Sequence, residues 1–169
     1  MSFPARAALP LAFVSLLFAG AIFGFFYAWI VSTMWGLDAA DPRLAIGAMQ
    51  AMNASVRNAA FAPVFFATPF VLLATAGAAL GVDRVTAWVF ALAGVVYLVG
   101  GLILTATVNV PMNNALGALA VPESIEAARD IWQAYSPRWQ SYNQLRTAVS
   151  GVSLLLTGYG LWRLGRRAG

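Results

Sequence analysis

Three long stretches without a charged residue constrain the fold of this chain more than any other feature. Residues 7–37, 58–82 and 85–122 contain no Asp, Glu, Lys or Arg. Each includes an apolar run of the roughly 20 residues that an α-helix needs to cross a bilayer. Only 9% of the residues are charged, whereas soluble domains are about 25% charged. The sequence therefore predicts an integral membrane protein.

A fourth uncharged stretch is shorter and begins after an arginine. Sixteen uncharged residues separate Arg146 from Arg163, so a spanning helix here must hold Arg146 at or inside the membrane boundary. We expect an all-α membrane four-helix bundle that forms one domain over residues 1–169. Its spans are expected at about 9–34, 61–80, 86–108 and 137–164.

The connections between these helices differ in length. Residues 81–84 form a short turn, whereas the first and third connections are long and are expected to hold one short amphipathic helix each. Asp41–Pro42 resembles an N-cap followed by proline at the first helical position, and Pro122–Trp132 is the second amphipathic stretch. Ser136–Pro137 predicts the start of the fourth helix, and Pro111 is expected to end the third.

Composition excludes several classes of site. The chain has no Cys and no His, so disulfides, zinc in His/Cys sites, haem held by His and His general bases are excluded. No carboxylate lies in a predicted span, which argues against a pump, a cation channel or a small transporter. No Gly-rich phosphate motif is present. We expect no cofactor, no metal and no nucleic-acid partner.

The orientation in the membrane is predicted from the basic C-terminal end. With both termini in the cytoplasm, five arginines lie on each side, so the count alone does not decide. Arg163, Arg166 and Arg167 directly flank the fourth predicted helix, as positive residues do on the cytoplasmic side. We expect a bacterial inner membrane location with both termini cytoplasmic, and the sequence leaves the oligomeric state open.

A polar stripe runs along the fourth predicted helix. Its members alternate in steps of three and four residues and so share one face: Asn143, Arg146, Ser150, Ser153 and Thr157. Lipid would reject this face, so we expect it to meet protein or a polar cavity. The three hydroxyl residues are expected to bond back to their own helix. Asn143 and Arg146 are expected to line a ligand pocket.

A structural ion pair is the competing explanation for the arginine of this stripe. A guanidinium close to hydrocarbon needs a partner or a cavity. The available acidic partners are Asp38, Asp41 and Asp130.

Two further clusters add polar and aromatic groups. Asn109, Asn113 and Asn114 surround Pro111, and their amides can bind a phenol, a ketone or water, or else form an Asx-type helix stop. A second series leads in steps of three and four to Arg146: Trp132, Tyr135, Trp139 and Tyr142. It is either an aromatic box for a flat ligand or a girdle at the membrane interface.

The two halves of the chain echo each other weakly. Gln50–Asn53 precedes Arg57, and Gln140–Asn143 precedes Arg146. The echo indicates two related helical hairpins, as in membrane proteins built from repeats, or a chance similarity.

Four motifs, in this order, resemble the anthrone oxygenase-like family of small membrane proteins, which was long described as a domain of unknown function. They are Met34–Leu37, Met49–Asn53, Asn109–Asn113 and Trp132–Thr147. The resemblance implies oxidation of polyketide anthrones to anthraquinones by molecular oxygen, without a cofactor. An alternative is a non-catalytic membrane protein that binds a lipid, a quinone or another hydrophobic ligand, or that serves as an assembly partner.

The resemblance and the residue inventory together imply a set of site residues. Arg146, Asn143 and Asn109, with Asn113, would hold the oxyanion of a deprotonated substrate. Trp139 and Trp132 would stack on its rings, and Tyr142 and Asn53 complete the substrate-binding set. The proton acceptor stays open among Asp38, Asp41 and Tyr142.

Overall fold

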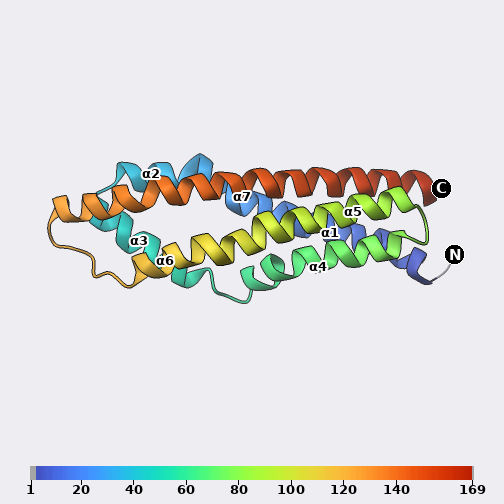
Figure 1. The fold of residues 1–169 in the computed structure, drawn as a ribbon, viewed down its shortest axis with the longest axis horizontal. Helices are drawn as coiled ribbons and strands as arrows, with labels where there is room; N and C mark the ends of the chain where they lie inside the picture. Colours follow the sequence, from blue (N-terminus) through green and yellow to red (C-terminus); the bar gives the residue numbers. More distant parts are fainter. Residues whose placement is uncertain (1–2, 169) are drawn as a thin grey trace.

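Every regular element in residues 3–168, the part of the chain that this computed structural model describes, is a helix (Figure 1). One long stretch joins α1 (Phe3–Ala28), the π-helical η1 (Trp29–Thr33) and α2 (Met34–Ala39). Then come α3 (Pro42–Ser55) and α4 (Phe61–Ala79). A second long stretch comprises α5 (Arg84–Tyr97), the π-helical η2 (Leu98–Ile103) and η3 (Thr105–Asn109), and α6 (Val110–Gly117). The last helix is α7 (Ile125–Ala168).

Four of these helices pack in a ring. Helix α1 contacts α4 and α7, and α5 contacts the same two helices from the other side. Figure 1 shows that α1 begins and α7 ends at the same end of the molecule. The other end is formed by α2, α3, α6 and the first turns of α7. The all-α fold agrees with the prediction.

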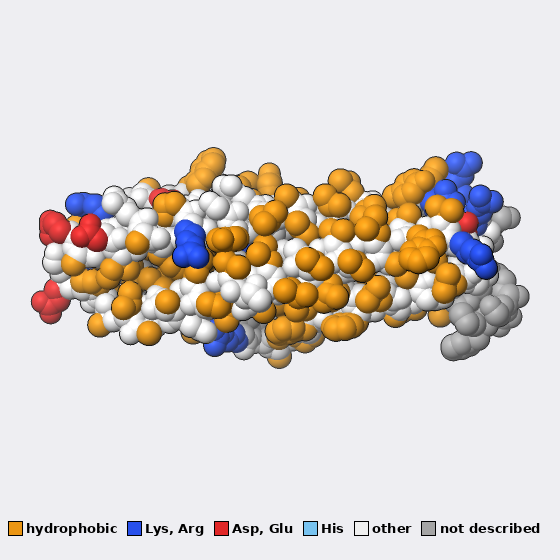
Figure 2. Space-filling model, in the orientation of Figure 1, with side chains coloured by type: hydrophobic (Ala, Val, Ile, Leu, Met, Phe, Trp, Pro, Cys, Tyr) orange, Lys and Arg blue, Asp and Glu red, His pale blue; other side chains and the backbone are white. Residues whose placement is uncertain are grey.

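The surface divides into an apolar middle and charged ends. Figure 2 shows hydrophobic side chains over most of the central part of one face, with acidic and basic side chains at one end and mainly basic side chains at the other. Among the described residues, three helical stretches are long and apolar enough to cross a membrane: Ala7–Ala39, Phe61–Ala79 and Arg84–Gly117. They are compatible with an integral membrane protein. Helix α7 is not among them, so the fourth span at 137–164 stays a prediction.

The prediction that Pro111 ends the third helix is wrong. The helical stretch that begins at Arg84 continues through α6 to Gly117. The backbone widens just before the proline, where the Val110 N–H bonds to the Thr105 carbonyl five residues back. Pro111 then lies in the first turn of α6, where a missing N–H removes the least hydrogen bonding. The first helical stretch likewise passes its predicted end at residue 34 and reaches Ala39.

The predicted helix start at Ser136–Pro137 is also wrong. Helix α7 begins at Ile125 and includes Pro137 in its interior. Both sides of the proline are held by one carboxylate, because the side chains of Trp132, Ser136 and Gln140 all donate to Asp38 at 2.7–2.9 Å. These contacts keep the helix continuous. The pair of short loop helices is therefore not observed, since the second merges with α7.

Helix α3 forms where the sequence indicates a start. The Asp41 side chain accepts a bond of 2.9 Å from the Arg43 N–H, and Pro42 is the first residue of the helix. The buried face of α3, which includes Ile46 and Met49, packs against Trp132 and its neighbours on α7.

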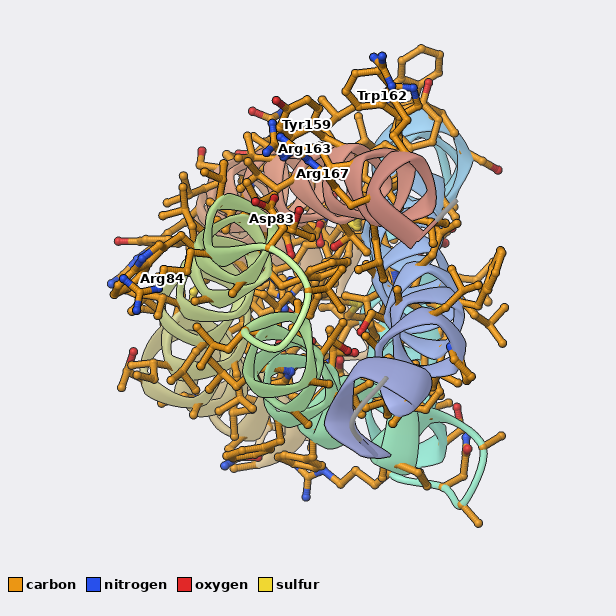
Figure 3. All side chains as sticks on the ribbon, turned by 90° about the vertical axis from the view of Figure 1, so that its right-hand side faces the viewer. Asp83, Arg84, Tyr159, Trp162, Arg163 and Arg167 are labelled. Carbon is orange, nitrogen blue, oxygen red and sulfur yellow. The ribbon has the colours of Figure 1, made fainter. Side chains whose placement is uncertain are left out.

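The turn between α4 and α5 is fixed to α7 by Asp83. Its carboxylate caps α5 by accepting from the Thr86 N–H at 3.0 Å and the Thr86 hydroxyl at 2.6 Å. It also accepts from Arg163 at 2.9 Å, and Figure 3 shows the two side chains at the end of the molecule where α7 finishes. The Thr86 hydroxyl and the Arg163 guanidinium hold the pKa of Asp83 well below its ordinary value.

We expect Asp83→Ala to lower the melting temperature by a few degrees at neutral pH, and Asp83→Asn to lower it less, because Asn keeps the cap and loses the charge. The folded pKa lies below the unfolded pKa of about 4, so the stabilisation is complete above pH 4 and fades below it. Thermal unfolding in detergent between pH 3 and 7 measures both effects. A difference in melting temperature between wild type and Asp83→Ala that becomes larger as the pH falls contradicts this prediction.

Candidate functional site

A cavity of about 510 Å³ lies where α4 begins, at the level of the α3–α4 connection. Helices α1, α3, α4, α6 and α7 and the π-helical η1 and η3 all contribute to its wall. The wall is largely aromatic: Phe25, Phe26, Trp29, Phe61, Phe65, Phe66 and Trp139. Its polar members are Asn53, Arg57, Thr105, Asn113, Asn114 and Arg146. The volume is in the range of small-molecule sites, about 300–1,000 Å³.

Arg146 is the buried charge of this cavity. The residue is 4% exposed, and its Nη1 donates to the Thr105 hydroxyl at 3.2 Å while its Nη2 donates to the Asn143 amide oxygen at 3.0 Å. Its Nε has no partner. The guanidinium carbon lies 4.5 Å from the Phe26 ring centre and 5.3 Å from that of Trp139. Two aromatic faces and two neutral oxygens therefore stabilise the cation.

The competing explanation for Arg146, a structural ion pair with Asp38, Asp41 or Asp130, is not found. Among the described residues, ion pairs join only Arg43 to Asp41 and Arg163 to Asp83. Asp38 accepts three hydrogen bonds from α7 instead. The buried guanidinium thus faces the cavity with no carboxylate beside it, which is an electrostatically costly arrangement in the absence of an anionic guest.

Asn143 orients this arginine and does not itself line the cavity. It is 1% exposed and donates its amide Nδ2 to the Phe26 carbonyl at 3.0 Å. This bond turns its Oδ1 toward Arg146. Two neighbouring helices, α1 and α7, therefore fix the position of the guanidinium.

Asn113 is the polar hub of the opposite wall. Its Oδ1 accepts from the Tyr135 hydroxyl at 2.8 Å and from the Trp139 indole N–H at 2.9 Å. Its Nδ2 donates to Asn53 Oδ1 at 2.9 Å. Burial raises the pKa of Tyr135, so its hydroxyl stays protonated and donates. This network fixes the Trp139 ring at the cavity wall.

Four of the predicted site residues, Arg146, Trp139, Asn113 and Asn53, meet at the cavity. Trp132 does not line the cavity, and its indole N–H donates to Asp38 of α2. Tyr142 is half-buried and also lies off the lining. Neither residue is part of the cavity lining, and their roles in substrate binding stay predictions.

Asn109 is fully buried next to the site but off the cavity lining. Neither its amide oxygen nor its amide nitrogen has a hydrogen-bond partner. It lies on the same stretch as Thr105 and Asn113, between the two contacts that these residues make with α7. A buried amide with no partner is rare in native proteins and calls for an explanation.

The three hydroxyl residues of the polar stripe all bond to backbone carbonyls, Ser150 and Thr157 within their own helix as predicted and Ser153 on another helix. Ser150 donates to the Arg146 carbonyl at 2.6 Å, and Thr157 donates to the Ser153 carbonyl at 2.7 Å. Ser153 itself bonds across to the Ala93 carbonyl of α5 at 3.0 Å. Only the Ser153 hydroxyl joins two helices, and none of the three residues lines the cavity.

Several lining residues were not predicted. Phe26, Trp29 and Phe65 belong to uniformly apolar helices, where sequence offers no sign of which aromatic ring faces inward. The only sequence signal for Arg57 was the weak similarity between the segment that precedes it and the segment that precedes Arg146.

The fold and the site together define an all-helical protein, with three helices apolar enough to cross a membrane, that encloses an aromatic cavity beside a buried arginine. Residues 49–156 match the model of the family described as anthrone oxygenase. The match covers nearly two thirds of the chain, and the chain belongs to this family. It includes three of the four motifs noted above, and Met34–Leu37 lies outside it. No curated protein and no solved structure gives a significant match.

We expect Asn109→Leu to stabilise the ligand-free protein by about 1–3 kcal/mol, because it replaces an unpaired buried amide with an apolar side chain of similar size. Thermal and denaturant unfolding in detergent measure this change. Gln133→Leu, at an exposed position away from the cavity, serves as the control and should change stability by less than about 0.5 kcal/mol. A less stable Asn109→Leu protein would mean that the amide is paired.

Proposed function

We propose that this protein is a membrane-embedded oxidoreductase that oxidises a lipophilic, anthrone-like aromatic with O₂ and without a cofactor. The observation that carries the proposal is the buried Arg146, which faces an aromatic cavity and has no carboxylate partner. Membership of the anthrone oxygenase family supports the same chemistry. The fourth span at 137–164, the bacterial inner membrane and the cytoplasmic termini belong to this proposal.

The reaction needs a stabilised anion more than it needs a metal. An anthrone loses a proton from the carbon opposite its carbonyl and becomes an enolate with negative charge on oxygen. The enolate passes one electron to O₂, and the two radicals combine and take up a proton to give a hydroperoxide. Loss of the second hydrogen of that carbon as a proton breaks the O–O bond and expels hydroxide. In sum, anthrone and O₂ give anthraquinone and water.

Arg146 is the group that we assign to the enolate oxygen. A cation within about 4–6 Å of an acid favours its ionised form and lowers its pKa by about 1–3. Burial strengthens this attraction, because little water screens it. Asn143 and Thr105 act through the guanidinium by holding its orientation. The neutral ketone gains less from the arginine than the enolate does, which is the condition for acceleration.

The aromatic wall suits a flat substrate. The indole of Trp139 is fixed by its bond to Asn113 and lies 5.0 Å from the Trp29 ring, centre to centre. Phe61 and Phe65 are stacked at 5.2 Å on α4. Rings held in this way bind a planar ligand by offset and edge contacts with little loss of side-chain freedom.

A non-catalytic role is favoured by one observation, namely that no carboxylate among the described residues lines the cavity. The protein would then bind a quinone, a lipid or another hydrophobic ligand. In the catalytic proposal the substrate proton goes to water at the open side of the cavity. Measurable binding of an anthrone without O₂ uptake above the spontaneous rate would select the non-catalytic role.

We expect Arg146→Gln to slow O₂ uptake with anthrone by about 10²- to 10³-fold, the usual effect of removing one oxyanion donor. Arg146→Lys should be intermediate, because it keeps the charge and loses the planar two-bond geometry. An oxygen electrode with detergent-solubilised protein, corrected for spontaneous oxidation, measures the rates. Arg138→Gln, at an exposed arginine of the same helix, is the control. Equal rates for wild type and Arg146→Gln would remove this arginine from the mechanism.

We also expect Asp41→Asn to leave kcat/KM unchanged. The Arg43 side chain holds the pKa of Asp41 at about 2, which makes it a poor proton acceptor, and Asn preserves the helix cap. The pH profile of kcat/KM should then rise with ionisation of the substrate and show no step near pH 4–5. A carboxylate step in that profile, or inactive Asp41→Asn, would restore a protein base.

A further inference from the structure

A second hollow lies next to the aromatic cavity. It has a volume of about 440 Å³ and its lining includes no aromatic side chain. The two spaces share four polar wall residues, which are Asn53, Arg57, Asn113 and Asn114. The polar rim of the aromatic cavity is therefore also the wall of the second hollow.

Arg57 stands at the junction of these two spaces. It is exposed, and its Nη2 donates to the Asn114 amide oxygen at 2.9 Å. Neither ion pair of the described residues involves it. Its guanidinium is thus a free positive charge with donors left over, at the point where a ligand would leave the aromatic cavity.

The position of Arg57 is set by rigid neighbours. Asn58 Nδ2 donates to the Ser55 carbonyl at 2.8 Å, while its Oδ1 accepts from the Phe61 N–H at 2.9 Å. The connection between α3 and α4 is therefore tied at both ends. Gln50 joins α3 to the end of α6 by donating to the Leu116 carbonyl at 2.9 Å. The groove is a built surface and not a chance gap.

Two arginines line one cavity, and no carboxylate lies on the same lining. Their combined charge of two is more than the single negative charge of an enolate would balance. Arg146 is buried and marks the deep end, whereas Arg57 is exposed and marks the open end. The two similar sequence segments, Asn53–Arg57 and Asn143–Arg146, thus each place an arginine on the lining of one cavity, while Asn143 lies behind its arginine. The charge of Arg57 therefore has no assigned partner in the proposed reaction.

We infer that the substrate is an amphiphilic aromatic with a carboxylate on an outer ring, away from the ketone oxygen that becomes the enolate. Arg57 binds this carboxylate at the cavity mouth. Arginine is suited to the task because its planar fork can bind both carboxylate oxygens. The contact would also set the direction of entry, since it leaves the uncharged ketone end to reach Arg146. This inference rests on the proposed function and names its substrate class.

The test compares two stable product analogues, anthraquinone and anthraquinone-2-carboxylate. Their binding to detergent-solubilised protein is followed by quenching of tryptophan fluorescence, because Trp29 and Trp139 line the cavity. Wild type should prefer the carboxylate by about tenfold, a modest value that allows for the exposure of Arg57. Arg57→Gln should lose this preference and keep its affinity for anthraquinone. Arg57→Lys should retain part of it, and Arg138→Gln all of it.

The outcomes separate this inference from the proposed function. Equal binding of both analogues by wild type, or a preference that survives Arg57→Gln, overturns the inference and leaves the aromatic site standing. Failure of both analogues to bind wild type overturns the proposed function and the inference with it. Oxygen uptake with anthrone and with its 2-carboxylate provides a second readout. The Arg57→Gln protein should oxidise the anthrone 2-carboxylate more slowly than wild type, by about the factor lost in binding, and should oxidise anthrone at the wild-type rate.

Discussion

The burial of one unpaired guanidinium is the constraint around which this structure is arranged. An isolated charge in a protein interior is unfavourable by several kcal/mol unless polar or aromatic groups surround it. Arg146 receives oxygens from Thr105 and Asn143 and the faces of Phe26 and Trp139. These partners come from α1, η3 and α7, so the same contacts that stabilise the charge also hold three helices together. The guanidinium still lacks a negatively charged partner, and the cavity beside it has room for one.

The cavity itself follows from differences in helix length. Helix α4 begins at Phe61, whereas the stretches containing α1 and α5 continue as α2 and α6, and α7 begins at Ile125. The ring of four helices is therefore incomplete at one end, and α3 with its short connection covers the gap. The wider π-helical turns lie on the two long stretches at this level. Such turns shift the facing of side chains without ending the helix, which brings Trp29 and Thr105 to the wall.

Sequence reasoning found the helices and the main charge but not the details of their contacts. Uncharged intervals predicted three apolar helices, and steps of three and four predicted that Asn143 and Arg146 share a face, since both signals are local. The prolines misled, because Pro111 and Pro137 lie in helices that are kept continuous by a widened turn and by Asp38. The contact of Trp132 could not be predicted, because nothing in the sequence shows that Asp38, 94 residues away, accepts its indole N–H. Long-range partners of this kind are set by packing and not by spacing.

The absence of a carboxylate from the described cavity lining has a chemical consequence for how such a site would act. A protein base would have to compete with Arg146 for the charge, because a carboxylate beside the guanidinium would form an ion pair and neutralise it. A site that lacks one keeps its full positive potential for the substrate. The substrate then ionises because its anion is bound more tightly than its neutral form, and the proton can pass to water through the open side. Under this arrangement the buried arginine sets both the affinity for the anion and the rate of its formation, so that binding and activation depend on one interaction.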